Sequence, residues 1–292
     1  MSFSSEVKQE LNKNSNLVNK EIVKNELIGY LISRNIEIVE KKNIKFSTES
    51  DYNINRFSKL LTNLNINHHI EIVGRNFVIK LKKKDIQTLV EIKDNLIYLK
   101  ENYINGIKEE FLRAIVRGVF MGSGSINDPN KKYHLEISFN IEENLNGVIS
   151  ILKILGINTK KMIIENKKSL YIKEGEEISK FLALIGAAKA VMKFEEIRIR
   201  KEMRGKVNRI VNCETANLNK TINASIEQIA AIKKLKENGK FNNLSENLKE
   251  IANLRLENPD MALSDLGKKL DKPLGKSGVN YRLRKIMEIA NE

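Results

Sequence analysis

Two apolar stretches decide the fold: NELIGYLISR at residues 25–34 and AIVRGVFMGS at residues 114–123. They begin 89 positions apart, and each has small residues four positions apart: Gly29 and Ser33, then Gly118 and Gly122. Small residues at this spacing lie on one helix face and let another backbone approach closely. A glycine inside a helix costs roughly 1 kcal/mol relative to alanine, which indicates a packing role. We therefore expect two helices that pack on each other through these four residues.

Similar elements follow both stretches. After the first we expect strands at 36–40 and 43–48, a helix at 51–64, and strands at 69–73 and 76–81. After the second we expect strands at 125–126 and 133–139, a helix at 141–155, strands at 161–164 and 169–172, and helices at 176–184 and 187–200. An α-β-β-α-β-β-α unit is thus predicted twice, in pseudo-repeats 1–100 and 101–200 of one α+β domain, 1–200.

The remainder of the chain predicts helices only. Residues 201–245 are expected to form basic connecting helices, one of them at 221–237, with Gly239 just after its end, and a linker near 236–245. Residues 246–292 predict a helix that ends before Asn258, a short helix around 263–270, a turn and a longer third helix at 276–290. This order is typical of a helix-turn-helix DNA-binding domain.

The third helix has two chemically different faces. Val279, Leu283, Ile286 and Ala290 form an aliphatic side suited to burial. The side chains expected to face a DNA major groove are Ser277, Asn280, Tyr281 and Arg284. Asparagine suits adenine and arginine suits guanine, because each can form two hydrogen bonds with the base edge. The candidates for phosphate contact are Lys276, Arg282 and Lys285. The alternative is a solvated basic helix in an interaction module.

Overall charge supports a polyanionic partner. The chain has 51 Lys and Arg against 37 Asp and Glu, a net charge of +14. Nucleic acid is the first partner this favours and a membrane surface the second, and lysine used for solubility is the third explanation. The single cysteine and three histidines exclude an intrachain disulfide and a Cys- or His-based metal cluster. No stretch has signal-peptide or membrane-spanning length, so we expect a cytoplasmic protein with no membrane partner and no cofactor.

The connecting segment 198–220 is strongly basic, with seven Lys or Arg and two Glu. We assign Arg204 and Arg209 as candidates for DNA-backbone contact. Asn212, Glu214 and Asn217 are expected to brace the junction between domains, and Cys213 is expected to be a small buried residue. Both phosphate binding and bracing remain open for the segment as a whole.

Several longer stretches carry a family resemblance. They are GSGSINDP at 122–129, YHLE at 133–136, KEMR at 201–204, VNRIVNCETANLNKT at 207–221, KSGVN at 276–280 and RLRK at 282–285. In this order the chain resembles the WhiA sporulation-regulator family of Gram-positive bacteria. The resemblance implies a LAGLIDADG homing-endonuclease-like domain joined to a DNA-binding module, and a role in transcription tied to sporulation or cell division. It implies double-stranded DNA as partner, RNA polymerase or a sigma factor as a protein partner, and a nucleoid location.

The resemblance also allows the nuclease chemistry to be assessed. In active LAGLIDADG nucleases the paired helices end in carboxylates that hold divalent metal ions. Here those positions are Arg34 and Ser123, and Asn35 stands where the family usually has a glycine. We therefore predict no catalytic residue, no bound metal and no enzyme activity. A metal-dependent DNA endonuclease and a protein-interaction scaffold of the division machinery are the alternative functions.

The sheet faces directed away from the helices are the remaining candidate surface. In the homing-endonuclease fold this face is the DNA-binding saddle. Its basic candidates are Lys45, Lys80, Lys82, Lys132 and His134. Glu71 and Glu136 interrupt them, so a solvated polar sheet face and a DNA surface are both open at this point.

Overall fold

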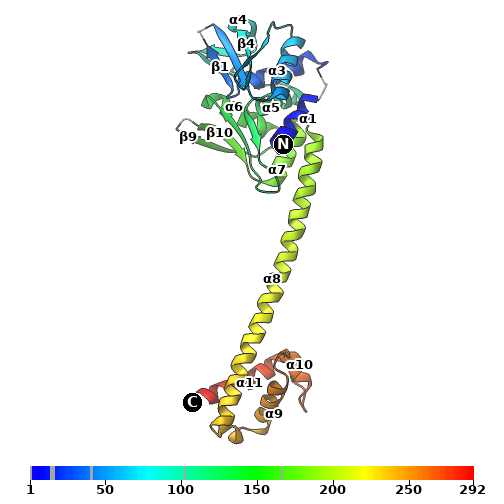
Figure 1. The fold of residues 1–292 in the computed structure, drawn as a ribbon, viewed down its shortest axis with the longest axis vertical. Helices are drawn as coiled ribbons and strands as arrows, with labels where there is room; N and C mark the ends of the chain where they lie inside the picture. Colours follow the sequence, from blue (N-terminus) through cyan, green and yellow to red (C-terminus); the bar gives the residue numbers. More distant parts are fainter. Residues whose placement is uncertain (1, 14–16, 40–41, 102, 166) are drawn as a thin grey trace. The chain divides into compact units, whose positions relative to one another are not determined.

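The computed structural model describes residues 2–13, 17–39, 42–101, 103–165 and 167–292. The chain divides into two compact units, Met1–Lys201 and Glu202–Glu292. Figure 1 shows the mixed helix and sheet of the first unit and the helices of the second. Each unit has a hydrophobic core of its own.

The first unit contains the predicted duplication. The first repeat comprises α2 (Lys20–Leu31), β1 (Ile36–Val39), β2 (Asn43–Thr48), α3 (Asp51–Asn63), β3 (Ile70–Val73), β4 (Asn76–Lys82) and the short α4 (Lys83–Ile86). The second comprises α5 (Glu109–Ser123), β7 (Gly124–Ile126), β8 (Leu135–Phe139), α6 (Glu142–Ile154), β9 (Lys160–Ile164), β10 (Lys167–Ile172) and α7 (Gly175–Leu184). The α+β class and its repeated unit are thereby confirmed. Glu40, predicted to end the first strand, lies outside the described residues.

The two sheets have the same topology. Their strand orders are β1-β2-β4-β3 and β7-β8-β10-β9, and every pairing within them is antiparallel. In the first sheet Ile44 pairs with Leu81 and Phe46 with Ile79, and all four side chains are buried. Because side chains alternate across a strand, this register directs Lys45 and Lys80 to the opposite face.

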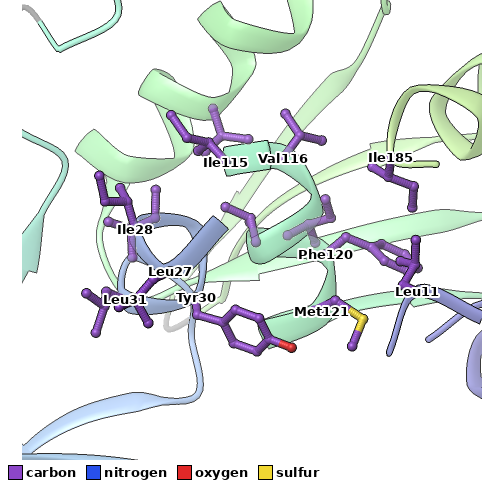
Figure 2. Packing of buried hydrophobic residues seen from close by; sticks show 14 of the residues in the cluster. Leu11, Leu27, Ile28, Tyr30, Leu31, Ile115, Val116, Phe120, Met121 and Ile185 are labelled. Atoms are coloured by element: carbon purple, nitrogen blue, oxygen red, sulfur yellow. The ribbon is translucent and has the colours of Figure 1, made fainter. Parts of the chain in front are cut away.

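The core of the first unit lies around the crossing of α2 and α5. Figure 2 shows a single cluster of apolar side chains in which Leu27, Ile28 and Tyr30 of α2 lie with Ile115 and Phe120 of α5. A Cβ atom built on Gly29 would lie inside 3.0 Å of the Ile115 carbonyl oxygen, and one on Gly118 would lie inside 3.0 Å of the Glu26 carbonyl oxygen. The two backbones therefore touch directly, and only glycine fits at either position.

Gly122 and Ser33 continue the same close contact. A Cβ atom on Gly122 would lie inside 3.0 Å of the Ser33 Oγ. Ser33 lies just after the end of α2 and is buried, and its hydroxyl donates to the Tyr30 carbonyl oxygen in the last turn of that helix at 2.7 Å. All four small residues of the two apolar stretches therefore lie where α2 and α5 meet.

Two elements of the first unit have no counterpart in the sequence prediction. α1 (Phe3–Lys13) precedes the first repeat and buries Phe3, Val7 and Leu11. The hairpin of β5 (Glu91–Lys93) and β6 (Leu96–Tyr98) connects the repeats. The buried Asn144 of α6 accepts from the Leu99 backbone N–H at 2.9 Å and donates to the Ile97 carbonyl oxygen at 2.8 Å, so the hairpin is fixed to the second repeat.

The connecting segment is one helix, which corrects the prediction of separate helices. α8 runs from Ala188 to Glu237 without interruption and includes Gly205. Apolar periodicity is weak over its middle, where nearly all side chains are exposed, and a sequence pattern based on burial cannot show that the helix continues there. Gly239 has φ 74°, which confirms its predicted place just after the helix end.

The second unit is entirely helical. After the end of α8 come a 3₁₀ turn (Lys240–Asn243), α9 (Glu246–Glu257), α10 (Leu263–Lys268) and α11 (Lys276–Asn291). Its core includes Ile232 and Leu235 of α8 together with residues of the three later helices, so the core extends back beyond the predicted boundary at 246. The turn between α10 and α11 is tight, because Gly267 accepts from the Leu274 N–H at 3.0 Å.

The helix crossing gives a stability prediction. We expect Gly118→Ala to lower the free energy of unfolding of the first unit by about 1–3 kcal/mol or more, because the added methyl overlaps a backbone carbonyl. The matched control is Gly147→Ala in α6, where the new Cβ meets only the Leu99 Cδ2 at 3.3 Å and a helical alanine is favoured over glycine.

Urea unfolding followed by tyrosine fluorescence measures this difference, because six of the seven tyrosines lie in the first unit and the chain has no tryptophan. Equal midpoints for Gly118→Ala and Gly147→Ala would contradict the backbone contact.

Candidate nucleic-acid interface

α11 presents the two faces that its sequence predicts. Val279, Leu283, Ile286 and Ala290 are at most 3% exposed and pack into the core of the second unit. Gly275 precedes the helix in an extended conformation and provides no side-chain cap. The N–H groups of the first turn therefore have no side-chain acceptor within the cap, which leaves them able to donate to an external acceptor.

The residues predicted to contact bases lie on the outer face. Ser277, Tyr281 and Arg284 are exposed, with Tyr281 at 68%, and Asn280 is half-buried. Lys276 and Lys285, the phosphate candidates, are also exposed. Glu288 is the first acidic residue of the helix, so its first three turns present positive charge and hydrogen-bonding groups.

Arg282 has a different environment from the one that the sequence suggests. Its guanidinium donates to the Asn247 carbonyl oxygen at 3.3 Å and lies 3.9 Å from the Glu250 carboxylate, and its side chain is 19% exposed. These contacts tie the middle of α11 to α9. Arg282 therefore positions the helix, and its assignment as a phosphate contact stays a prediction.

Arg204 and Arg209 lie on the exposed middle part of α8. Cys213 is also exposed there, so the expectation that it is buried was wrong. Its sulfur accepts from the Asn217 Nδ2 at 3.8 Å, one helical turn later. Asn212, Glu214 and Asn217 are exposed as well, and Asn217 also accepts from the Thr221 hydroxyl through its carbonyl oxygen at 3.0 Å, one turn further along the same helix.

The helix ends that carry carboxylates in nucleases have other chemistry here. Arg34 is exposed, and the Ser123 hydroxyl donates to the Ser138 carbonyl oxygen at 2.7 Å. Asn35 donates to the Gly122 carbonyl oxygen at 2.7 Å and so links the two repeats. Within the described part of the chain, no group of three or more His, Cys, Asp or Glu side chains could hold a metal ion.

A buried ionic cluster, which the sequence analysis missed, lies beside the helix crossing. Glu26 of α2 is fully buried, and its carboxylate accepts from the Arg56 Nε at 2.7 Å and Nη2 at 2.8 Å and from the Arg117 Nε at 2.9 Å. The three residues join α2, α3 and α5. Burial by itself would raise the pKa of Glu26, but the hydrogen bonds and charges of the two arginines hold it below its ordinary value.

Some of the basic residues of the sheet faces lie close to acids. Lys45 lies 3.9 Å from Glu37, and Lys80 lies 3.0 Å from Glu71. In the second sheet His134 stacks on Tyr171 and lies 3.4 Å from Glu136. Lys82 and Lys132 are exposed.

Two crossed repeats with glycine-faced helices, followed by a helix-turn-helix unit, define a LAGLIDADG-like protein joined to a helical module of DNA-binding type. The WhiA LAGLIDADG-like domain family matches residues 112–204, and the WhiA C-terminal HTH domain family matches residues 207–290. A Clostridium novyi protein named "Probable cell division protein WhiA" is 40% identical over 322 residues, which cover 100% of this chain and 98% of that protein. The chain belongs to the WhiA family.

Solved structures agree with this assignment. The crystal structure of full-length DUF199/WhiA from Thermatoga maritima matches with a TM-score of 0.60 at 30% identity, covering 100% of this chain and 98% of that one. The N-terminal LAGLIDADG domain of DUF199/WhiA matches with a TM-score of 0.50 at 27% identity, covering 64% of this chain and 93% of that one. In the described residues, no helix combines the length and apolar character needed to cross a bilayer.

The buried ionic cluster generates a pH-dependent prediction. Glu26→Gln removes the buried carboxylate that Arg56 and Arg117 contact, and we expect a loss of about 3–5 kcal/mol of stability at pH 7. The pKa of Glu26 in the folded state is below its ordinary value of 4.5. The stability that the ionised carboxylate contributes is therefore fully present above pH 4.5 and is lost as the pH falls through the folded-state pKa. The difference between wild type and variant should therefore narrow below about pH 4.5.

The matched control is Glu109→Gln, which removes an exposed carboxylate paired with Arg113 one turn along α5 and should cost less than about 1 kcal/mol. Urea unfolding at several pH values compares the two variants. A Glu26→Gln protein as stable as the Glu109→Gln protein at pH 7 would contradict the assigned role of the cluster.

Proposed function

We propose that this protein is a sequence-specific, double-stranded-DNA-binding transcription regulator, and that α11 is the element that contacts bases. The observation that supports the proposal is the outer face of α11, where Ser277, Tyr281 and Arg284 are exposed and Asn280 is half-buried beside a fully packed aliphatic face. A recognition helix needs both faces, one to fix it in the domain and one to enter the major groove.

The distribution of charge supports the same element. Residues 276–285 contain four Lys or Arg and no acid, whereas residues 245–292 as a whole contain nine Lys or Arg and eight Asp or Glu. Within residues 245–292, the net positive charge is therefore concentrated on α11. This positive charge would attract the DNA phosphates on either side of the major groove. Lys276 and Lys285 are the proposed phosphate contacts in α11. Arg204 and Arg209 of α8 are proposed as further backbone contacts.

The names of the relatives give the biological context. Relatives of the same family are named probable cell division proteins. We propose that this chain acts in transcription linked to cell division or sporulation, at the nucleoid, with RNA polymerase or a sigma factor as protein partner. In this role the LAGLIDADG-like domain would contribute by docking a protein, which is the scaffold alternative, and the acids close to basic residues on its sheet face favour that use over DNA binding.

Loss of the outer face of α11 should abolish specific binding. We expect the double variant Asn280→Ala, Arg284→Ala to lose on the order of a hundredfold in affinity for a specific duplex, because each bidentate base contact contributes about 1–3 kcal/mol. Fluorescence anisotropy with a duplex taken from bound DNA, measured at fixed salt, tests this. Arg75→Ala, which removes an exposed arginine from a turn of the first unit, is the control and should bind normally. Normal binding by the double variant would remove α11 as the recognition helix.

We also propose that the LAGLIDADG-like domain does not cleave DNA. Arg34 and Ser123 cannot supply the oxygen ligands that a Mg²⁺ ion requires, and the buried Glu26 is engaged by two arginines. Purified protein incubated with Mg²⁺ or Mn²⁺ and supercoiled plasmid should leave the plasmid intact. Metal-dependent nicking that disappears in a Glu26→Gln protein would overturn this assignment.

A further inference from the structure

A small cavity lies in the helix-turn-helix unit where four helices meet. Its volume is about 240 Å³, below the roughly 300–1,000 Å³ of pockets that hold drug-sized molecules. Residues of α8, α9, the start of α10 and the first residue of α11 line it: Lys220, Thr221, Ala224, Gln228, Arg255, Ala262, Leu263, Ser264 and Lys276. The cavity therefore suits one compact group and lies next to the start of the proposed recognition helix.

The charges that line the cavity are all positive. Lys220, Arg255 and Lys276 contribute three cationic side chains, and the lining residues, all within the described chain, include no Asp or Glu. Lys220 and Lys276 are exposed, so each can move toward a group in the cavity. A small cavity with three cations and no acid is complementary to an anion.

Arg255 is the unusual residue of this set. It is 1% exposed, and its recorded hydrogen-bond acceptors are the backbone carbonyl oxygens of Asn258 at 3.5 Å, Pro259 at 3.2 Å and Met261 at 2.7 Å. These contacts hold the loop between α9 and α10, but they involve only Nη1, and the buried Nε has no partner in the described structure. Burial lowers the pKa of Arg255, with no carboxylate in the described chain to offset it. A buried guanidinium without a countercharge is costly, so an external anion would stabilise it.

Gln228 provides a second, independent sign that something belongs in the cavity. It is 5% exposed, and its Oε1 atom has no hydrogen-bond partner among the described residues. Buried amide groups in folded proteins are almost always hydrogen-bonded. Rotation of the amide by half a turn exchanges its oxygen and nitrogen, so the same side chain can donate to an acceptor in the cavity. The Ser264 hydroxyl, at the start of α10, is a further donor.

We propose that this cavity binds a phosphate group, with Arg255, Gln228, Lys220 and Lys276 as its ligands. A phosphate has several acceptor oxygens and a negative charge, which match one buried guanidinium, one amide and two mobile ammonium groups. Two sources share this chemistry: a phosphodiester of the duplex that α11 contacts, or a free phosphate ion. The first source rests on the proposed DNA-binding function, whereas binding of the phosphate group itself does not.

Gln228→Glu is the most informative variant. It places a carboxylate in the cavity that Arg255 also lines, which supplies a countercharge from within the chain and repels an external anion at the same time. We therefore expect the variant to fold and to melt at an equal or higher temperature than wild type, but to lose phosphate binding. The matched control is Ala230→Glu, which adds the same charge at a position of α8 that does not line the cavity.

The first experiment uses the full-length protein and inorganic phosphate at constant ionic strength. Broadening of the ³¹P resonance should saturate with wild type and with Ala230→Glu. Affinity should fall about tenfold in Lys220→Ala and in Lys276→Ala, since each removes one charge-assisted hydrogen bond, and binding should vanish in Gln228→Glu. A purely structural role for Arg255 predicts a change of melting temperature in Gln228→Glu with no saturable phosphate binding by any of the proteins.

The second experiment distinguishes the two sources. Duplexes with one neutral methylphosphonate linkage at a time are bound by wild type and by Gln228→Glu over a range of salt concentrations. If the ligand is a phosphodiester, the neutral linkage at one position weakens DNA binding by wild type but not by Gln228→Glu. The slope of log affinity against log salt concentration is then also smaller for the variant by about one. If free phosphate is the ligand, the two proteins bind every duplex alike while only wild type broadens the phosphate resonance.

The outcomes separate the cavity from the proposed function. The cavity proposal would be overturned if wild type bound specific DNA but showed no saturable phosphate binding, and if no neutral linkage affected wild type and Gln228→Glu differently. The DNA-binding function would then remain in place. Saturable phosphate binding by a protein that binds no duplex would support the cavity and contradict the proposed function.

Discussion

The direct backbone contact between α2 and α5 is the constraint on which the first unit depends. Gly29 and Gly118 each face a carbonyl oxygen of the other helix, and Ser33 faces Gly122 one turn further along. This contact fixes how the two repeats meet, and with it the position of both four-stranded sheets. The buried carboxylate of Glu26 lies beside the crossing, where two arginines from neighbouring helices fix it. In an active nuclease the helix pair would present carboxylates to a metal ion, whereas here the buried charge is used inside the fold.

The second unit depends on a similar separation of faces within one helix. The aliphatic side of α11 packs into the core, and Arg282 joins the middle of the helix to α9. The side chains on the opposite side of α11 remain exposed or half-buried. Arg255 likewise holds the loop before α10 while its charge stays without a partner carboxylate in the described chain. Positive side chains therefore lie both on the outer face of α11 and in the cavity at its start.

The sequence predicts best those elements whose burial pattern is set by residues close together in the chain. Strand alternation gave the bounds of β2, and helical spacing gave α11 to within a residue, because side-chain burial follows the backbone period in both. The continuity of α8 was missed because its middle is exposed and has no burial pattern. The environments of Glu26, Arg282 and Arg255 were missed for a different reason: each depends on residues distant in sequence or on backbone carbonyls. Cys213 was expected to be buried because cysteine is often a buried residue type, but it lies on the exposed part of α8.

The outer face of α11 is proposed to recognise a particular DNA sequence. Selection of tightly bound duplexes from a randomised pool by the full-length protein tests it most directly, since the selection works without any assumption about the site. We expect successive rounds to enrich one motif, and that motif to contain adenine or guanine at positions protected by α11. A pool that stays random while the protein remains bound to it would mean that binding is electrostatic only, and it would contradict the claim.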